Sequence, residues 1–362
     1  MRKMGMLVSL AAAFALVFAA SMSLTKEGTH LLPEGVTSFV KIGNYIYTAA
    51  GNWGVVIYDV SDSSNIVQAG VWRADESDFT AQTVTEVLNR SGKLVVVHQG
   101  PGFEVSILDL SSPTNPTLIG HVTDRMLFHS HANPVVHCAD IWGNILAMGI
   151  DSAGTGQGGV MLVNTTDPHF PIFGSVWWGE SGYNIEDIIS YSKYIIITQW
   201  NSSSSSGRIV SLEYDDVNGS FINQKYTYVL GGTHPYGIAR GISRGDTLYF
   251  YVALGPNGVG TYKLRNDGTI VPVGAAWAKT DTTDDVRNLF AYGDRLFICN
   301  FESDTTNITG IIVAPIDTTT WMPTDTVAVY PARYVRAAWA DSNRVYFIGD
   351  MSKGSGTAPG AR

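Results

Sequence analysis

Short apolar runs recur along the chain at a nearly constant spacing. Seven of them occur, at residues 45–47, 94–97, 145–148, 194–197, 248–251, 296–298 and 345–348. Their starts are 49, 51, 49, 54, 48 and 49 residues apart, and most follow a turn with Gly, Asn, Asp or Ser. Short runs rich in β-branched and aromatic residues between turns predict β-strands. The constant spacing predicts one structural unit repeated along the chain.

Further strand patterns give each unit four strands. A second apolar run follows the first in six units, as at residues 54–60 and 159–164, and a third often ends in an aromatic such as Trp72 or Trp277. Another strand precedes each first run, as at residues 84–88. Four strands in each unit, with no long helical pattern, predict an all-β β-propeller made of four-stranded antiparallel blades. A pair of β-sandwiches and a β-helix are the alternatives, but this period is too long for β-helix rungs.

The second strand and its turn carry a family resemblance. The pattern at residues 54–62 reads Gly-Val-Val-Ile-Tyr-Asp-Val-Ser-Asp, and residues 107–116 and 161–168 give related versions. These segments resemble the LVIVD-repeat β-propeller family. The resemblance implies a secreted or surface propeller, mostly without known activity. It fades in units four to six, where Glu213, Lys263 and Pro315 replace or displace the Asp.

The length suits seven blades, but the last one is incomplete. We expect the propeller over residues 22–350 and a flexible C-terminal tail over residues 351–362, which is rich in Gly, Ser and Ala. Unit seven lacks two outer strands, and residues 24–32 could supply the outermost. Three explanations stay open: a fragment of a longer chain, a short last blade, or a strand from a neighbouring molecule.

The N-terminus has the pattern of a signal peptide over residues 1–21. Arg2 and Lys3 precede an apolar run that ends in small residues. The alternative is a membrane anchor, for which this run is at the lower limit of length. Cleavage would leave a mature chain without a membrane span, with 21 Lys and Arg against 32 Asp and Glu, a net charge of −11. We therefore expect an extracellular, cell-surface or periplasmic location and no nucleic-acid partner.

The cysteines and several histidines give separate predictions. Cys138 and Cys299 fall in units three and six, on nearly opposite sides of a seven-unit ring, so we expect two free buried thiols. His129, His131 and His234 lie in connections that lead into inner strands. Glu180 and Asp284 occupy corresponding connections in other units. Together these five side chains could hold a divalent metal at the mouth of the central channel, although such loops are polar in any case.

Two functions fit these patterns. The first is a secreted or cell-surface binding or structural interaction module, whose partner is a protein, a glycan or a second copy that exchanges a strand at the incomplete blade. Regular repeats without a catalytic motif favour it. The second is an extracytoplasmic metal-dependent hydrolase or oxidase that uses the predicted His, Asp and Glu site. Fold alone does not decide between them, because propellers host both.

Overall fold

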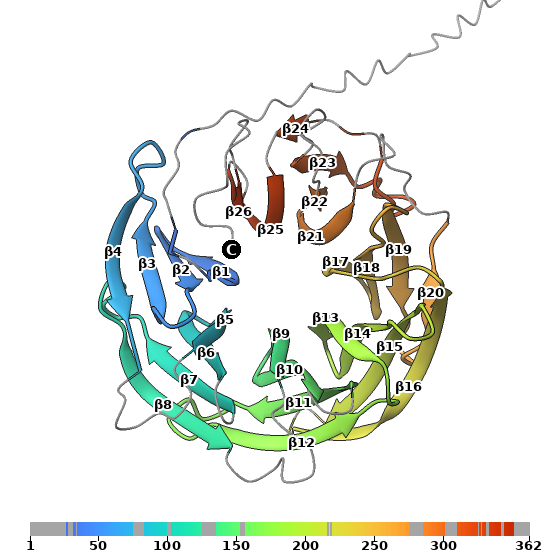
Figure 1. Cartoon of the computed structure of the whole chain (residues 1–362), viewed down its shortest axis with the longest axis horizontal. Coiled ribbons are helices and arrows are strands. Elements are labelled where there is room, and N and C mark those ends of the chain that lie inside the picture. The colour runs from blue at the N-terminus through green and yellow to red at the C-terminus, as the bar shows by residue number, and fades with distance from the viewer. Residues whose placement is uncertain are drawn as a thin grey trace, which may run out of the picture.

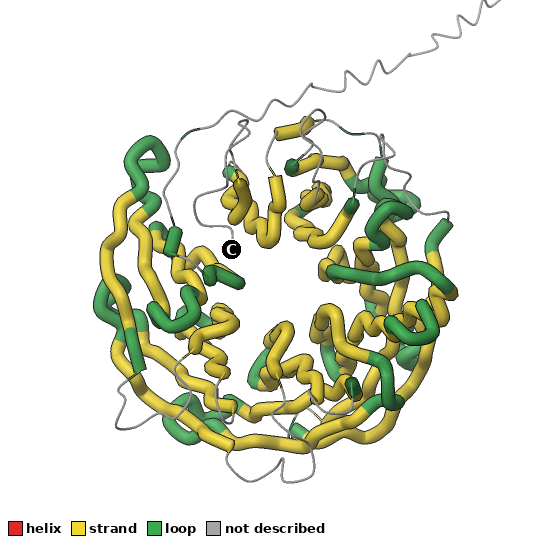
Figure 2. The backbone as a smooth tube through the Cα atoms, in the orientation of Figure 1, coloured by secondary structure: helices red, strands yellow, loops and turns green. Residues whose placement is uncertain are grey.

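The computed structural model describes most of the repeat region. The described residues are 27, 32–33, 35–74, 83–99, 103–124, 135–152, 156–215, 217, 219–274, 285–300, 310–324, 326, 328–330, 333–341 and 344–350. The predicted signal peptide and C-terminal tail lie outside this part of the chain. Every regular element in it is a β-strand (Figure 2). No helix in the described part is long and apolar enough to span a membrane.

The strands form sheets arranged around a ring (Figure 1). Blades one to three contain β1 (Ser38–Ile42), β2 (Tyr45–Ala49), β3 (Val55–Asp59), β4 (Val67–Trp72), β5 (Thr83–Arg90), β6 (Lys93–Gln99), β7 (Phe103–Asp109), β8 (Thr117–Asp124), β9 (Val135–Trp142), β10 (Ile145–Ser152), β11 (Gln157–Asn164) and β12 (Ile172–Trp178). Blades four to six contain β13 (Asn184–Tyr191), β14 (Tyr194–Asn201), β15 (Ser206–Asp215), β16 (Ser220–Gly231), β17 (Ile238–Arg244), β18 (Thr247–Ala253), β19 (Val259–Leu264), β20 (Ile270–Pro272), β21 (Val286–Tyr292), β22 (Arg295–Asn300), β23 (Ile311–Pro315) and β24 (Ala328–Tyr330). The seventh sheet contains β25 (Arg333–Ala340) and β26 (Val345–Asp350).

The predicted all-β propeller with four-stranded antiparallel blades is confirmed for six units. Each of these six sheets has its strands in chain order, with the first strand nearest the centre of the ring (Figure 1). The last unit differs, because its sheet has two strands in the described part of the chain. β25 contacts β21 on one side and β1 on the other, so the seventh sheet stands between blade six and blade one.

Alternate side chains of a strand are buried against the two neighbouring blades, one on each face of the sheet. In β14, Ile195 and Ile197 pack with Val160 of blade three, whereas Ile196 packs with Phe250 of blade five. All three isoleucines are fully buried, and burial of each contributes about 1.5–3 kcal/mol. Because both faces of the blade are covered, the strand reads as a continuous apolar run instead of an alternating one.

In blades two, three and four, a turn also docks on the outer strand of the blade before it. The backbone N–H of Ser175 in β12 donates to the carbonyl of Gly219 at 3.0 Å. A Cβ on Gly174 would overlap that carbonyl oxygen. The same close approach occurs at Gly70 beside Thr114 and at Gly120 beside Pro168. A residue without a side chain is therefore required where backbone meets backbone between these blades.

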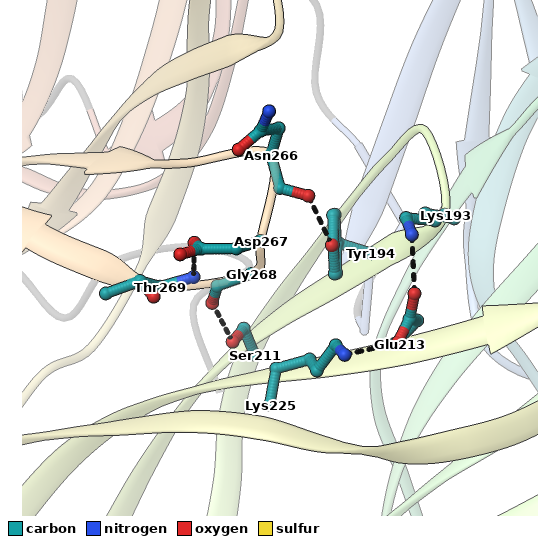
Figure 3. A network of polar contacts seen from close by, with 9 residues as sticks. All are labelled: Lys193, Tyr194, Ser211, Glu213, Lys225, Asn266, Asp267, Gly268 and Thr269. Carbon is teal, nitrogen blue, oxygen red and sulfur yellow. Dashed lines mark hydrogen bonds and ion pairs between the residues drawn. The ribbon is translucent and has the colours of Figure 1, made fainter.

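Polar contacts hold a turn of blade five against blade four in a similar way (Figure 3). The hydroxyl of Tyr194 donates to the carbonyl of Asn266 at 2.7 Å, and the hydroxyl of Ser211 donates to the carbonyl of Gly268 at 2.5 Å. Both acceptors belong to the turn between β19 and β20. Since Ser211 is fully buried, this turn gives a partner to a hydroxyl that would otherwise destabilise the core.

The acidic residue of the repeated strand-turn pattern has two different roles. Asp59 and Asp109 each accept a backbone N–H two residues further along the chain, at 2.8 and 3.2 Å, which closes the turn. Glu213 replaces this Asp in blade four and instead lies 2.6 Å from Lys193 and 2.8 Å from Lys225 (Figure 3). The hydrogen bond from Lys193 is the main cause of a lowered pKa of Glu213. The longer side chain therefore joins neighbouring strands rather than the turn.

Carboxylates on the inner strands also join one blade to the next. Asp187 of β13 accepts the backbone N–H of Ile238 in blade five at 2.8 Å. Asp140 of β9 accepts the N–H of Ser190 in blade four at 2.6 Å and pairs with Arg240 of blade five. Burial raises the pKa of Asp187 to about 7. Asp187 is therefore placed to hold inner strands together.

Glu86 occupies the corresponding position of β5. Like Asp187, it follows directly on a shift in the register of its strand. Burial raises the pKa of Glu86 to about 8, a hydrogen bond with Ser38 opposes this rise, and the charge of Asp187 adds to it. The folded protein therefore holds a proton on this carboxyl at pH values where the unfolded chain has lost it.

Both cysteines are free and buried, as predicted. Cys138 lies in β9 of blade three and Cys299 in β22 of blade six. Burial raises the pKa of the Cys299 thiol to about 12 and also raises that of Cys138. Neither thiol forms a reactive thiolate at neutral pH.

The turn docking predicts the effect of a single methyl group. Gly174→Ala places a Cβ against the carbonyl oxygen of Gly219, which is backbone and cannot rotate away, so we expect a loss of about 1–3 kcal/mol in the free energy of unfolding. Gly232→Ala is the matched control, because the nearest atom to its Cβ is 3.8 Å away. Urea denaturation followed by tryptophan fluorescence measures both. An equal loss in the two variants would contradict the close approach.

Glu86 predicts a pH dependence of stability. Its folded-state pKa is raised from an ordinary 4.5 to about 8. The protonated Glu86 carboxyl therefore stabilises the folded protein fully at pH values below its unfolded-state pKa. This stabilisation is lost as the pH rises through its folded-state pKa. We expect Glu86→Gln to be more stable than the wild type at pH 8, by on the order of 1 kcal/mol given the partial exposure of the channel wall, and equally stable near pH 4. Denaturation midpoints across this range, with exposed Asp246→Asn as control, test it. A constant offset at every pH would refute the linkage.

Candidate functional site

The predicted metal residues do not gather in the described part of the chain. His129, His131 and Asp284 lie outside the described residues. His234 and Glu180 are described and have different partners: His234 Nε2 lies 3.1 Å from Glu186, and Glu180 lies 2.7 Å from Arg208. Among the described residues, no three His, Cys, Asp or Glu side chains are placed to hold a metal ion together.

His234 is the middle member of a stack of rings. Its imidazole lies parallel to Trp200, with centroids 4.3 Å apart, and to Tyr236, with centroids 3.9 Å apart. Trp200 lies near the end of β14 in blade four, whereas His234 and Tyr236 lead into β17 of blade five. Buried Pro235 separates the two ring residues of this connection. The stack fixes the orientation of the imidazole, so that Nε2 faces Glu186.

Two arginines extend this surface, and the sequence patterns did not single out either one. Arg287 places its guanidinium 4.5 Å from the ring centroid of Tyr236 and 2.7 Å from the carboxylate of Asp285. Arg208 lies 3.6 Å from the ring centroid of Tyr183 and also pairs with Glu180. Cation–π contacts of this kind contribute about 0.5–2 kcal/mol each. The connections of blades four to six are therefore ordered by paired charges and stacked rings.

His137 has a role on the inner strand of blade three. Its Nε2 lies 3.0 Å from Asp151, whose other oxygen accepts the backbone N–H of Ile185 in blade four at 2.8 Å. The hydrogen bond with Asp151 is the main cause of a raised pKa of His137. This pair joins blades three and four next to Glu186, which also raises the pKa of His137.

A second candidate site lies where the seventh sheet meets blade one. β26 pairs with β25 on one side, and no strand of the described chain pairs with its other side. Ile348 of β26 packs against an apolar cluster of blade one that includes Val56 and Tyr58 of β3. β25 also contacts β1 of blade one, and the seventh sheet has no strand beyond β25 and β26 among the described residues, so the outer part of this face has no described strand over it.

This uncovered face forms a groove of about 600 Å³. It is lined by Pro33, Trp53, Val56, Gln68, Val71 and Arg73. Trp53 is 53% exposed and Val71 is 41% exposed. The guanidinium of Arg73 lies 5.3 Å from the Trp53 ring centroid. Between blades two and five the outer strands contact one another, β8 with β12, β12 with β16 and β16 with β20, whereas this groove leaves part of β4 exposed.

Comparison with known proteins agrees with the fold. The LVIVD repeat family model matches residues 35–72 and 102–124. Two similar solved structures are a putative 6-phosphogluconolactonase from Bacteroides uniformis and a protein from Lactobacillus plantarum. The first has 16% identity and a TM-score of 0.56 over 89% of this chain and 90% of its own. The second has 15% identity and a TM-score of 0.57 over 83% of this chain and 87% of its own.

Identities this low carry information about fold alone. No curated protein sequence matches the chain. The family model covers β1 to β4 of blade one and β7 and β8 of blade two, which include two of the segments on which the sequence resemblance rests. The chain is therefore a β-propeller that carries LVIVD repeats in its first two blades.

Proposed function

We propose that this protein is a secreted or cell-surface interaction module that assembles by strand exchange at an incomplete seventh blade. In this proposal β25 and β26 are the inner half of that blade, and the outer half is contributed by a second copy of the chain. The assembly is structural, and the ring of blades serves as a rigid platform for it.

One observation carries the proposal: the seventh sheet has two described strands, whereas each of the other six sheets has four. The outer edge of β26, which no strand of the described chain pairs, presents backbone N–H and C=O groups that an added strand would pair. The groove beside it offers the exposed side chains of Trp53 and Val71 to that strand. Burial of this apolar surface supplies the driving force, and backbone pairing supplies the orientation.

The N-terminal sequence supports the location. Arg2 and Lys3 before an apolar run, with small residues after it, suit export and cleavage. A mature chain with 32 acidic and 21 basic residues suits partners other than nucleic acids. Outside the cell, an exposed strand edge meets other copies of the same protein, or proteins and glycans of the surface.

The groove gives a direct test. Val71→Arg places a charged side chain in the groove, and it should raise the dissociation constant for self-association by at least about tenfold, equal to ~1.4 kcal/mol. Val67→Arg is the control, because Val67 lies in the same strand, is similarly exposed at 44% and does not line the groove. Light scattering of the chain from residue 22, over a range of concentrations, measures both. A wild-type chain that stays monomeric throughout would overturn the proposal.

The second candidate function is an extracytoplasmic metal-dependent hydrolase or oxidase at the channel mouth. The observation in its favour is the His234 imidazole, which is oriented by two rings with Nε2 toward Glu186. His129, His131 and Asp284 would complete the site.

This candidate predicts one tightly bound divalent ion per chain. Elemental analysis of the purified protein should find it, and His234→Ala should lose it. His169→Ala is the control, because His169 is exposed in a turn and pairs with Asp167. Protein without stoichiometric metal, before and after incubation with zinc, copper or calcium, would remove this candidate.

A further inference from the structure

The turn between β3 and β4 of blade one is built like the corresponding turn of blade two. The backbone N–H of Asn65 donates to the carbonyl three residues before it at 3.0 Å, and Asn115 does the same in blade two. Ser64 of blade one therefore corresponds to Thr114 of blade two. Because the backbone of the two turns is alike, we expect the turn of blade one to suit the same kind of docking.

Each corresponding turn meets a glycine in the outermost strand of the blade before it. The carbonyl of Thr114 in blade two lies where a Cβ on Gly70 of β4 would be. The carbonyl of Pro168 in blade three lies where a Cβ on Gly120 of β8 would be. An outermost strand can therefore cross such a turn only with a residue that has no side chain.

The turn of blade one faces the seventh sheet. Glu27 bonds Ser63 of this turn and also accepts a hydrogen bond from Arg344, directly before β26, at 3.0 Å. The hydrogen bond with Ser64 is the main cause of a lowered pKa of Asp62, and the charge of Arg344 adds to it. Since the seventh sheet has two strands in the described part of the chain, this turn has no described outermost strand to dock on.

We propose that the outer half of the seventh blade, contributed by a second copy of the chain, must carry a glycine where its outermost strand crosses residues 61–65 of blade one. This inference rests on the proposed function and adds the residue that the incoming strand requires. A second copy is the fitting partner because outermost strands of this chain already carry that glycine, as Gly70, Gly120 and Gly174 show. The groove then buries apolar side chains, and the turn selects for glycine.

A hairpin peptide tests this selection directly, because its contacts exist only in the complex. Residues 103–124 span β7 and β8, the outer half of blade two, and include Gly120. Labelled with fluorescein, this peptide should bind the chain from residue 22, as measured by fluorescence anisotropy. Gly120→Ala in the peptide should raise the dissociation constant at least about tenfold, because the added Cβ meets a backbone carbonyl that cannot rotate away.

Variants of the peptide and of the chain provide the controls. His121→Ala in the peptide should leave the dissociation constant unchanged, because His121 is the next residue and is exposed in blade two. Val71→Arg in the chain should abolish binding of the native peptide, because Val71 lines the groove. Val67→Arg should not, because Val67 lies in the same strand outside the groove. Binding that survives Val71→Arg would place the peptide elsewhere and overturn the inference.

The remaining outcomes separate this inference from the proposed function. Equal dissociation constants for the native and Gly120→Ala peptides would show that the turn does not select glycine. No binding of either peptide up to about 1 mM would also overturn the inference, and self-association of the chain in light scattering would then leave the proposed function standing. A chain that prefers the native peptide yet stays monomeric would support the selection for glycine and overturn self-assembly instead.

Discussion

Face-to-face packing of sheets is the constraint on which this structure depends. A four-stranded blade with Val, Ile and Phe on both faces has no stable form alone, because each face must be covered by another blade. Ile196 and its neighbours Ile195 and Ile197 show this directly, since one strand contributes to two separate cores. The ring is the arrangement in which every face finds a neighbour. The scarcity of charge in the sequence follows from the same demand.

The polar groups at the junctions serve this packing. Near the starts of inner strands, a carboxylate from a neighbouring blade accepts a backbone N–H, as Asp187 does for Ile238 and Asp151 does for Ile185. Burial then raises the pKa of Asp187, which is a shift often associated with catalysis. Here the geometry gives a structural cause, because the carboxyl faces backbone N–H groups of the next strand. Carboxyl groups with raised pKa values around this channel are therefore weak evidence for catalysis.

Features that follow from the repeating apolar pattern could be predicted from the sequence. Features that depend on one contact with another blade could not. The strands and their grouping into units follow from apolar runs and turns, which act locally, so six blades could be predicted. Gly174 could not be recognised, because its requirement comes from Gly219 in the next blade. Likewise, His234 lies in the same kind of loop as the other candidate metal ligands. Its position depends instead on the rings of Trp200 and Tyr236 and on the carboxylate of Glu186. Residue type and loop position carry no information about these partners.

The junction between the seventh sheet and blade one is subject to the same packing constraint as the junctions between the other blades. Blade one presents an apolar face toward the seventh sheet, and that face needs the same cover as the others. Ile348 of β26 packs against the cluster that contains Val56 and Tyr58, while Val71 and Trp53 stay exposed in the groove. An uncovered apolar face beside an unpaired strand edge favours the addition of a strand, since burial and backbone pairing are gained together. The assembly that we propose completes the packing at this junction, where the described chain leaves it incomplete.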